Sequence, residues 1–408
     1  LNSSQQLAVI LFDKLKLPMI KKRSTAEAVL SELKDKHPLP ELILSYRKLY
    51  KLKNTYLDPL PSYIISDTQR VHSSFNQTMT ATGRLSTSSP NFQNIPIRTE
   101  DGKEIRKAIK AQSNEYQIFS ADYSQVELRV MAHLSGDESL ISALNNGEDI
   151  HTFTAKNIFN VDNDDMVLPE MRRIAKIVNF GIMYGAGPFR LSQELDIPFG
   201  EAKQIKDAYF QKYQGIEQYI ENSKLQIKET KSVETLLGRK RAVWDSDSQN
   251  KIRRDAAERM AINMPIQGTA AEMIKLAMIK IHRQMNKENL KSKLIMQIHD
   301  ELLLEVHQDE IDYISKMVIE HMKNAMKLDV PIEIDNSSLV GKSLVIILIT
   351  PPVKSAGKSA LADLITKTFE RRFVGKRSIC IVFLSGSNPG ISTPFKIDLE
   401  YRSPRPLT

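Results

Sequence analysis

Cysteine is almost absent from this sequence, which holds a single one, Cys380, in 408 residues. One cysteine excludes an internal disulfide framework and fits a reducing compartment. Long apolar runs are also missing, so no segment is predicted to span a membrane. The N-terminal residues lack the charged-then-apolar order of a secretory signal, and we therefore expect a cytoplasmic protein. Because the chain begins with Leu1 and not with Met, we expect a fragment or a processed product.

An excess of positive charge is missing from most of the chain, although the net charge is +8. From Ser337 to the end there are 11 Lys and Arg against 4 Asp and Glu, which leaves 46 against 45 in residues 1–336. A polyanion partner of the main part must therefore be bound by local clusters of cations. Two clusters lie at 21–23 and 47–53, the second with Lys51 and Lys53. A solvated helix face explains them equally well.

The order of apolar and polar residues predicts an α+β fold, because short strands lie on either side of a long helical stretch. Beyond Asp335 the composition shifts to a basic tail that ends rich in Pro and Ser, for which we assign no fold. The tail's "KSAGKS" is not a phosphate-binding loop, since position 352 is Pro and not the required Gly. The expected elements are helices over 1–60 broken at Pro38 and Pro40, strands within 63–120, a strand and helix over 117–135, helices over 136–290, strands from 292, a helix over 309–327 and a strand over 330–335.

Acidic residues interrupt two of the apolar segments. In "KLIMQIHDELLLEV", residues 293–306, two short strands flank His299, Asp300 and Glu301. A hairpin turn explains the interruption, although adjacent carboxylates are costly to desolvate without a cation beside them. Asp122 lies where a predicted strand runs into a predicted helix. The position alone can explain an acid, because a helix N-terminus favours negative charge. Ser124 and Glu127 fit a capping box for that helix.

Four residues of "MRRIAKIVNFGIMYGAG" are spaced along one ridge of a predicted helix that begins after Pro169 and ends at 185–187. They are Arg172, Lys176, Phe180 and Tyr184. The cations could extend over a core stripe, or the four side chains could bind a phosphate chain and stack on a base. The spacing leaves both explanations open.

The segment "RMAINMPIQGTAAEM" predicts a helix that is broken at a proline. Arg259 and Asn263 share a face of this helix before Pro265. Thr269 with Glu272 forms the predicted capping box of a following helix. Gln267, at the predicted break, is free to donate a hydrogen bond to a partner outside the helix.

Five segments occur in a fixed order: "TATGRLSTSSPNFQNIP", "DYSQVELR", "RRIAKIVNFGIMYG", "INMPIQGTAAEMI" and "MQIHDELLLEV". Together they resemble the polymerase region of family A DNA polymerases, of the bacterial DNA polymerase I large-fragment type, over roughly residues 1–335. The resemblance implies a right-hand fold with a helical thumb, an antiparallel-sheet palm and helical fingers. It implies a thumb over 1–62 without its first part, a palm over 63–135 and 261–335, and fingers over 136–260, and it leaves 336–408 unassigned.

The resemblance also implies the roles of individual residues. Asp122 and Asp300, with the backbone carbonyl of Tyr123, would hold two Mg²⁺ ions, for which Mn²⁺ could substitute. Glu301 would be an auxiliary acid. Nucleotide binding would fall to Arg172, Lys176, Phe180, Tyr184, His151, Glu127 and Gln125, with Lys176 also a general acid for the pyrophosphate and Glu127 excluding a 2′-hydroxyl. DNA binding would fall to Arg84, Arg259, Asn263, Gln267, His299, Lys51 and Lys53.

The implied activity is template-directed DNA synthesis on primer–template DNA from dNTPs, in replication and repair, by a monomeric bacterial enzyme of the cytoplasm and nucleoid. Two alternatives stay open. The first is a catalytically impaired fragment that binds primer–template DNA. The second is a single-subunit RNA polymerase, against which Glu127 and Phe180 argue. For the tail we favour a frameshifted segment over a gene fusion or an extension, and in that case we expect the last palm strand to close the sheet poorly.

Overall fold

The structure is a computed structural model that describes residues 2–95, 101, 105 and 109–339. These residues divide into two compact units, of which the first holds 2–72 with 101 and 105, and the second holds 73–95 and 109–339. The tail from 340 onward lies outside the described residues. None of the helices in the described ranges has the length and apolarity needed to cross a bilayer.

The first unit is helical. Its own core includes Leu11 and Leu30. Pro38 begins the longest helix, because a proline in the first turn loses no hydrogen bond. Pro40 lies within that same helix, so the predicted break there is wrong. The elements are α1 (Ser4–Ala8), a π-helical segment (Val9–Lys14), α2 (Glu27–Leu33), α3 (Pro38–Leu52), a second π-helical segment (Lys53–Leu57), β1 (Ile64–Ile65) and β2 (Arg70–Val71).

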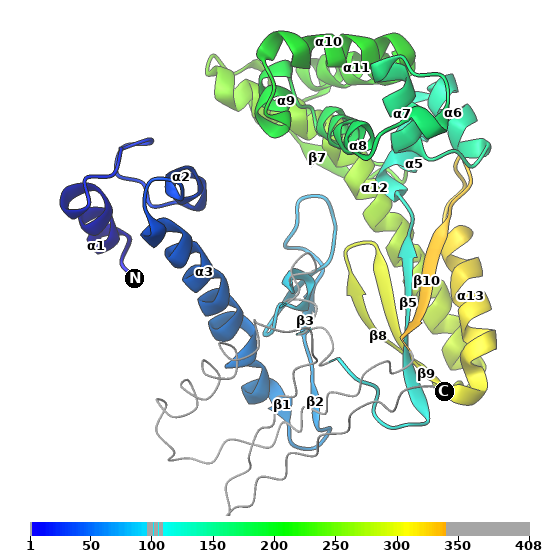
Figure 1. The fold of residues 1–408 in the computed structure, drawn as a ribbon. Coiled ribbons are helices and arrows are strands. Elements are labelled where there is room, and N and C mark those ends of the chain that lie inside the picture. Colours follow the sequence, from blue (N-terminus) through cyan, green and yellow to red (C-terminus); the bar gives the residue numbers. More distant parts are fainter. Residues whose placement is uncertain (1, 96–100, 102–104, 106–108, 340–408) are drawn as a thin grey trace, which may run out of the picture. The chain divides into compact units, whose positions relative to one another are not determined.

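The second unit is built on an antiparallel sheet with the strand order β10-β5-β9-β8 (Figure 1). These strands are β5 (Tyr116–Tyr123), β8 (Lys293–Ile298), β9 (Glu301–His307) and β10 (Ile334–Leu339). The last strand begins at Ile334, four residues later than predicted. All six of its residues pair with β5, from Ile334 opposite Tyr123 to Leu339 opposite Ile118. The expected poor closure of the sheet is therefore not seen in the described part of β10.

The two faces of the sheet carry different residues. Phe119 and Ala121 of β5 join the main core with Leu304 of β9. Ile118 and Leu303, which point to the opposite face, form a small separate cluster. Because side chains alternate along a strand, Asp122 shares this second face with Ile118. The carboxylate thus emerges on the side of the sheet away from the main core.

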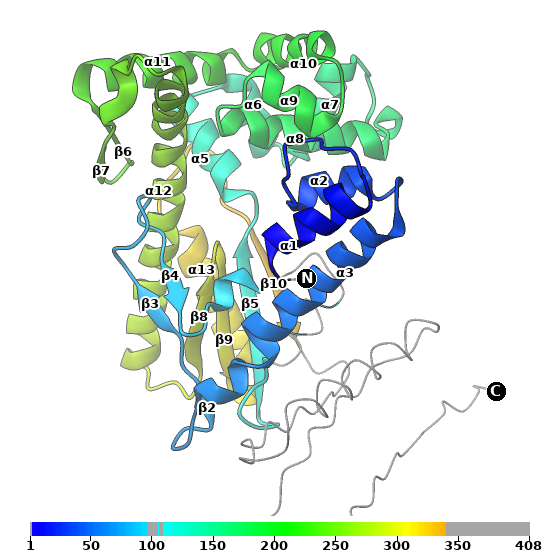
Figure 2. The same ribbon diagram turned by 90° about the vertical axis from the view of Figure 1, so that its left-hand side faces the viewer.

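Helices cover the core face of the sheet. α13 (Ile311–Lys323) packs across β5, β9 and β10, and α12 (Lys251–Lys287) packs against α13 and α5 (Val126–Ser135). Figures 1 and 2 show α12 running past the sheet to a group of shorter helices. These are α6 (Glu138–Asn145), α7 (Ile150–Phe159), α8 (Pro169–Met183), α9 (Pro188–Leu195), α10 (Phe199–Lys212) and α11 (Gln214–Thr230).

Pro265 lies inside α12 and does not end it, so the predicted helix break is wrong. The neighbours Met264 and Ile266 are almost fully buried, and their packing holds the helix together across the missing N–H. Because the helix continues, Thr269 and Glu272 cannot form a capping box. Thr269 Oγ1 accepts a hydrogen bond from the Leu236 N–H at 3.2 Å.

That contact is part of the attachment of a small hairpin, β6 (Ser232–Glu234) and β7 (Lys240–Ala242), to α12. Arg239 in the hairpin turn pairs with Glu272, with Nε 3.0 Å from Oε1. Gly268 permits the close approach, since a Cβ there would lie 2.5 Å from Thr235 Cγ2. Two strands of the first part of the second unit, β3 (Ser74–Asn76) and β4 (Ser86–Ser88), form another hairpin.

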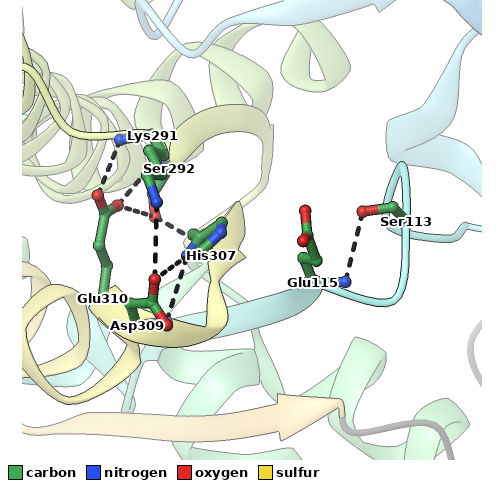
Figure 3. A network of polar contacts seen from close by, with 7 residues as sticks. All are labelled: Ser113, Glu115, Lys291, Ser292, His307, Asp309 and Glu310. Carbon is green, nitrogen blue, oxygen red and sulfur yellow. Dashed lines mark hydrogen bonds and ion pairs between the residues drawn. The ribbon is translucent and has the colours of Figure 1, made fainter.

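A polar network ties the start of β8 to the end of β9 and the start of α13 (Figure 3). The Glu310 carboxylate accepts hydrogen bonds from the Lys291 N–H at 2.9 Å and from the N–H and hydroxyl of Ser292 at 3.0 and 2.6 Å. Ser292 Oγ in turn accepts from the His307 N–H at 3.0 Å. One carboxylate therefore holds together three elements.

We expect Glu310→Ala to lower the free energy of unfolding by about 1–3 kcal/mol at pH 7, because several hydrogen bonds to a charged acceptor are lost. Burial raises the pKa of Glu310, but the Ser292 hydroxyl and the two amides together hold it below its usual value. This stabilisation is therefore present above the unfolded-state pKa and is lost as the pH falls through the folded-state value. Denaturant titrations from pH 3 to 7 would show the difference between variant and wild type shrinking at low pH.

The control is Asp312→Asn, an exposed acid in the first turn of α13, for which we expect a change of no more than about 0.5 kcal/mol. A Glu310→Ala effect equal to that of the control would mean that the network does not stabilise the sheet end.

Candidate active site

Three carboxylates lie in one row across the end of the sheet. Asp122 of β5 is opposite Glu301 of β9 on one side and opposite Asp335 of β10 on the other. Directly opposed residues point to the same face, so the three side chains are neighbours. The sequence had indicated two of them, and Asp335 was missed because only the strand register brings it there.

Asp300 lies next to this row. It forms with His299 the two-residue turn between β8 and β9, so the predicted hairpin is confirmed. His299 has φ +54°, in the left-handed region that such turns use. The Asp300 carbonyl accepts a hydrogen bond from the Tyr123 N–H at 3.2 Å, which attaches the turn to the end of β5. A turn and a carboxylate site are therefore compatible.

The carboxylates disturb one another's ionisation. Partial removal from water and then the charges of Glu301, Asp300 and Asp335 raise the pKa of Asp122 to about 7. Burial also raises the pKa of Asp300, against the lowering effect of the nearby Arg84 cation. Glu301 is held in place by the Ser120 hydroxyl, which donates to its Oε1 at 2.5 Å.

Glu127 does not cap α5, so the capping box predicted from Ser124 and Glu127 is wrong. The cap position is Gln125, with φ +52° and no side-chain capping bond. Glu127 instead accepts hydrogen bonds from Arg84 Nη2 and the Tyr184 hydroxyl, each at 2.5 Å. Arg84 Nη2 also lies 3.7 Å from Asp300 Oδ1. Through Tyr184 on one side and Arg84 on the other, the buried Glu127 therefore links the end of α8 to the end of the sheet.

A pocket of about 370 Å³ opens at this place. Eight of the nine residues that line it were named from the sequence, and the ninth is Val126. The lining residues are Arg84, Tyr123, Gln125, Val126, Glu127, Phe180, Tyr184, His299 and Asp300.

The predicted ridge of α8 is present, and its two aromatic residues, Phe180 and Tyr184, are partly buried and pack against the main core. The buried face of this helix includes Ala175, Val178 and Ile182, whereas Arg172 and Lys176 are exposed. Phe180 and Tyr184 stack with ring centroids 6.2 Å apart, and both line the pocket.

Two residues from α7 meet this ridge. The buried His151 ring lies 5.7 Å from the Phe180 ring. Asp149, at the N-cap of α7, binds Arg172 with both carboxylate oxygens, at 3.2 and 2.6 Å. Burial raises the pKa of Asp149, but hydrogen bonds from Arg172 and Thr152 lower it to about 2. Sequence analysis missed Asp149, because an acid at a helix N-cap already has a structural explanation.

Arg259, Asn263 and Gln267 lie at four-residue spacing on the unbroken α12. Asn263 Nδ2 donates to the Tyr184 carbonyl at 3.4 Å, and its buried Oδ1 has no partner. Arg259 packs against Gly185, where a Cβ would lie 3.0 Å from its Cγ. This face of α12 therefore meets the end of α8 beside the pocket.

Among the described residues, no group of three or more His, Cys, Asp or Glu side chains is arranged so that it could hold a metal ion. Mg²⁺ is commonly bound by one or two carboxylates together with substrate phosphates and water, which requires no such group. The carboxylate oxygens of Asp122 and Asp300 are the hard donors that this ion prefers. Burial, and then the negative charges of Glu301, Asp300 and Asp335, raise the pKa of Asp122, and a divalent cation would offset both effects.

The site combines acidic residues at the end of a sheet with a helix ridge of cations followed by aromatic rings, which are the side-chain types that bind phosphates and stack on bases in other proteins. Comparison with known proteins identifies the family. The model of DNA polymerase family A matches residues 1–343, and the chain belongs to that family.

Individual relatives agree. The chain is 48% identical over 341 residues to the thermostable DNA polymerase I of Thermus caldophilus, covering 82% of this chain and 40% of that protein. It is 46% identical over 342 residues to DNA polymerase I of Bacillus subtilis, covering 83% and 39%. Among solved structures, the POL domain of Pol1 from M. smegmatis in complex with DNA primer-template and dNTP matches with a TM-score of 0.77 and 42% identity, over 83% of this chain and 60% of that one. The chain thus spans about 40% of the length of the curated relatives it matches.

Proposed function

We propose that this chain carries out template-directed DNA synthesis, adding deoxynucleotides from dNTPs to a primer 3′-hydroxyl by a two-metal mechanism. The observation that carries the proposal is the meeting of Asp122, Asp300 and Glu301 beside a pocket lined by Phe180 and Tyr184. Family membership supports it, as does a similar polymerase domain that is described as a complex with primer-template and dNTP.

The right-hand fold is part of this proposal. The four-stranded sheet with α13 and the later part of α12 would be the palm, over 63–135 and 261–335. The helices from α6 to the start of α12 would be the fingers, over 136–260, and residues 1–62 would belong to the thumb. The acids would then lie in the palm and the basic ridge of α8 in the fingers.

At the sheet end, Asp122, Asp300 and the Tyr123 carbonyl would hold two Mg²⁺ ions, with Mn²⁺ as a possible substitute. When bound, the ions lower the pKa of the primer hydroxyl and stabilise charge on the transferred and leaving phosphates. The chain's residues keep the donors apart and oriented. Glu301, fixed by the Ser120 hydroxyl, would act as an auxiliary acid.

On the nucleotide side, Arg172, Lys176 and His151 would bind the triphosphate, and Lys176 would donate a proton to the leaving pyrophosphate. Phe180 would pack on the sugar, with Gln125 nearby and Tyr184 at the template base. Arg172 is bound to Asp149 in the structure, so nucleotide phosphates would compete with that carboxylate.

On the DNA side, Arg84, Arg259, Asn263 and Gln267 would contact the minor groove next to the primer end, and His299 the primer terminus. Minor-groove acceptors occur in every Watson–Crick pair, so these contacts would sense pairing geometry without selecting sequence. Lys51 is exposed, and Lys53 forms an ion pair in which its Nζ lies 2.5 Å from Asp58 Oδ2. As phosphate contacts, both would make DNA binding salt-dependent.

Primer extension with a labelled primer, a template, four dNTPs and Mg²⁺ tests the proposal. Extension that copies the template supports it. Binding of the primer–template without extension would favour the alternative of an impaired DNA-binding fragment. Preferred incorporation of ribonucleotides would favour a single-subunit RNA polymerase.

We expect Phe180→Tyr to raise incorporation of dideoxynucleotides by at least about tenfold relative to dNTPs, because the added hydroxyl can replace the hydrogen bond that the missing 3′-hydroxyl made. Competition between ddNTP and dNTP in single-nucleotide extension measures the ratio. Phe210→Tyr, a ring on α10 that does not line the pocket, is the control. An unchanged ratio in Phe180→Tyr would remove Phe180 from the sugar-binding part of the site.

A further inference from the structure

A buried chain of polar side chains runs from α7 through α8 to Tyr213, the residue between α10 and α11. Asn179 Nδ2 lies 3.1 Å from His151 Nδ1 and 3.1 Å from Thr154 Oγ1. Thr154 Oγ1 lies 2.8 Å from the Tyr213 hydroxyl. All four residues are at most 3% exposed, so this is an ordered interior network and not a surface contact.

The contact with Asn179 favours one tautomer of His151, because the amide nitrogen faces the ring. An amide nitrogen only donates, so His151 Nδ1 must accept from Asn179 and cannot itself carry a hydrogen. In the neutral imidazole the single N–H then belongs to Nε2. Thr154 Oγ1 lies within hydrogen-bond reach of both amide atoms of Asn179, 3.1 Å from Nδ2 and 3.2 Å from Oδ1, and so keeps the amide plane beside the ring.

The surroundings favour the neutral ring. Burial and the positive charges of Arg172 and Lys176 lower the pKa of His151 to about 4, although Asp149 acts in the opposite direction. Protonation of Nδ1 would also place two donors against each other at the contact with Asn179. A bound triphosphate would favour the protonated ring, because its negative charge attracts a proton. The hydrogen bond from Asn179 to Nδ1 would counteract that effect.

We propose that Asn179 is a positioning residue that holds His151 as a neutral Nε2–H donor, so that His151 offers the dNTP triphosphate a directed hydrogen bond while Arg172 and Lys176 supply the charge. The proposal rests on the proposed role of His151 in binding dNTP. It adds a residue that touches no substrate and a defined protonation state for one that does.

The first test is spectroscopic and needs no activity. Long-range ¹H–¹⁵N correlation spectra of the full chain with ¹⁵N-labelled histidine distinguish the two neutral tautomers and the imidazolium, and His151→Gln identifies the signal. We expect the Nε2–H tautomer from pH 6 to 8 in wild type, and a mixture of tautomers in Asn179→Leu. A wild-type Nδ1–H tautomer or imidazolium at pH 7 would overturn the proposal, as would an unchanged Nε2–H signal in Asn179→Leu.

The second test is kinetic. We expect Asn179→Leu to raise the KM for dNTP about tenfold with kcat within about threefold, because an interaction with bound nucleotide is lost. In Asn179→Asp the carboxylate accepts from Nδ1–H, raises the pKa of His151 and gives the KM a pH dependence between 6 and 8 that wild type lacks. The control Asn157→Asp, whose amide in α7 binds only the Phe153 carbonyl, should show neither change.

The two tests separate the inference from the proposed function. One outcome is that the Nε2–H tautomer is present in wild type and lost in Asn179→Leu, while neither wild type nor any variant extends a primer. In that case the proposed function fails and the effect of Asn179 on the ring stands. If wild type extends a primer and both Asn179 variants keep its KM and pH profile, the positioning role is wrong and the proposed function stands.

Discussion

Replacing Asp122 or Asp300 by alanine is expected to abolish primer extension, by about 10⁴-fold or more, and to leave primer–template binding nearly unchanged. Each carboxylate would hold a cation that stabilises the negative charge of the transition state by several kcal/mol. A 10⁴-fold loss of rate corresponds to about 5–6 kcal/mol. DNA binding would depend instead on Arg84, α12 and the basic residues of the first unit. Loss of synthesis without loss of affinity is therefore the signature of metal ligands.

Single-turnover extension and fluorescence-anisotropy binding measure the two quantities on the same variants. Asp309→Asn is the matched control, because it removes an acid at the opposite end of β9 from the active-site acids. Extension by either alanine variant within tenfold of wild type would exclude that residue as a ligand.

The electrostatics of Asp122 argue against unfolding as the source of such a loss. The raised pKa of Asp122 means that the folded state without metal binds a proton more readily than the unfolded chain does. Stability from this group therefore falls as the pH rises from the unfolded-state pKa toward 7. Asp122→Asn should accordingly be at least as stable as wild type at pH 8 without metal, which a thermal melt would show.

The sheet, the hairpin and the ridge of α8 could be predicted because each depends on a local pattern. Short apolar runs predicted β5 and β9, and four-residue spacing predicted the ridge from Arg172 to Tyr184. Such patterns need no knowledge of distant partners. The position of β10 was less well predicted, since "VPIEID" supplies the β-formers but the pairing with β5 begins only at Ile334.

The errors have a common physical cause. Two acids were assigned to capping boxes, yet Glu127 is bound by Arg84 and Tyr184, and Glu272 by Arg239. Local propensity was overridden by partners that lie 33 to 57 residues away along the chain. Pro265 was judged by the same local rule, although tertiary packing carries α12 through it.

Asp149, Asn179 and Asp335 were missed for the opposite reason. Their local sequence looks ordinary: an N-cap acid, an amide in a helix and an acid in a strand. Only the register of β10 with β5 and the packing of α7 on α8 bring them to the site. The family resemblance carried over residues in known motifs, and it could not name residues whose roles depend on their contacts in this chain.

Replacing Glu127 by alanine is expected to lower the preference for dNTPs over ribonucleotides by about 10²–10³-fold, the equivalent of about 3–4 kcal/mol. Glu127 is 7% exposed and lines the pocket, with both carboxylate oxygens held by hydrogen bonds. A side chain fixed in this way cannot move aside for a 2′-hydroxyl. Its removal opens the space, and it also frees Arg84 and Tyr184.

Glu127→Gln separates these two effects. The amide keeps the volume and removes the charge, so discrimination should stay within about tenfold of wild type if exclusion is steric. Competing dATP and ATP in single-nucleotide extension give the ratio for each variant, and Tyr184→Phe reports the loss of one hydrogen bond alone. If alanine and glutamine lower discrimination equally, the ion pair with Arg84 selects the sugar and the size of Glu127 does not. If neither changes it, Glu127 serves only to join α8 to the sheet end.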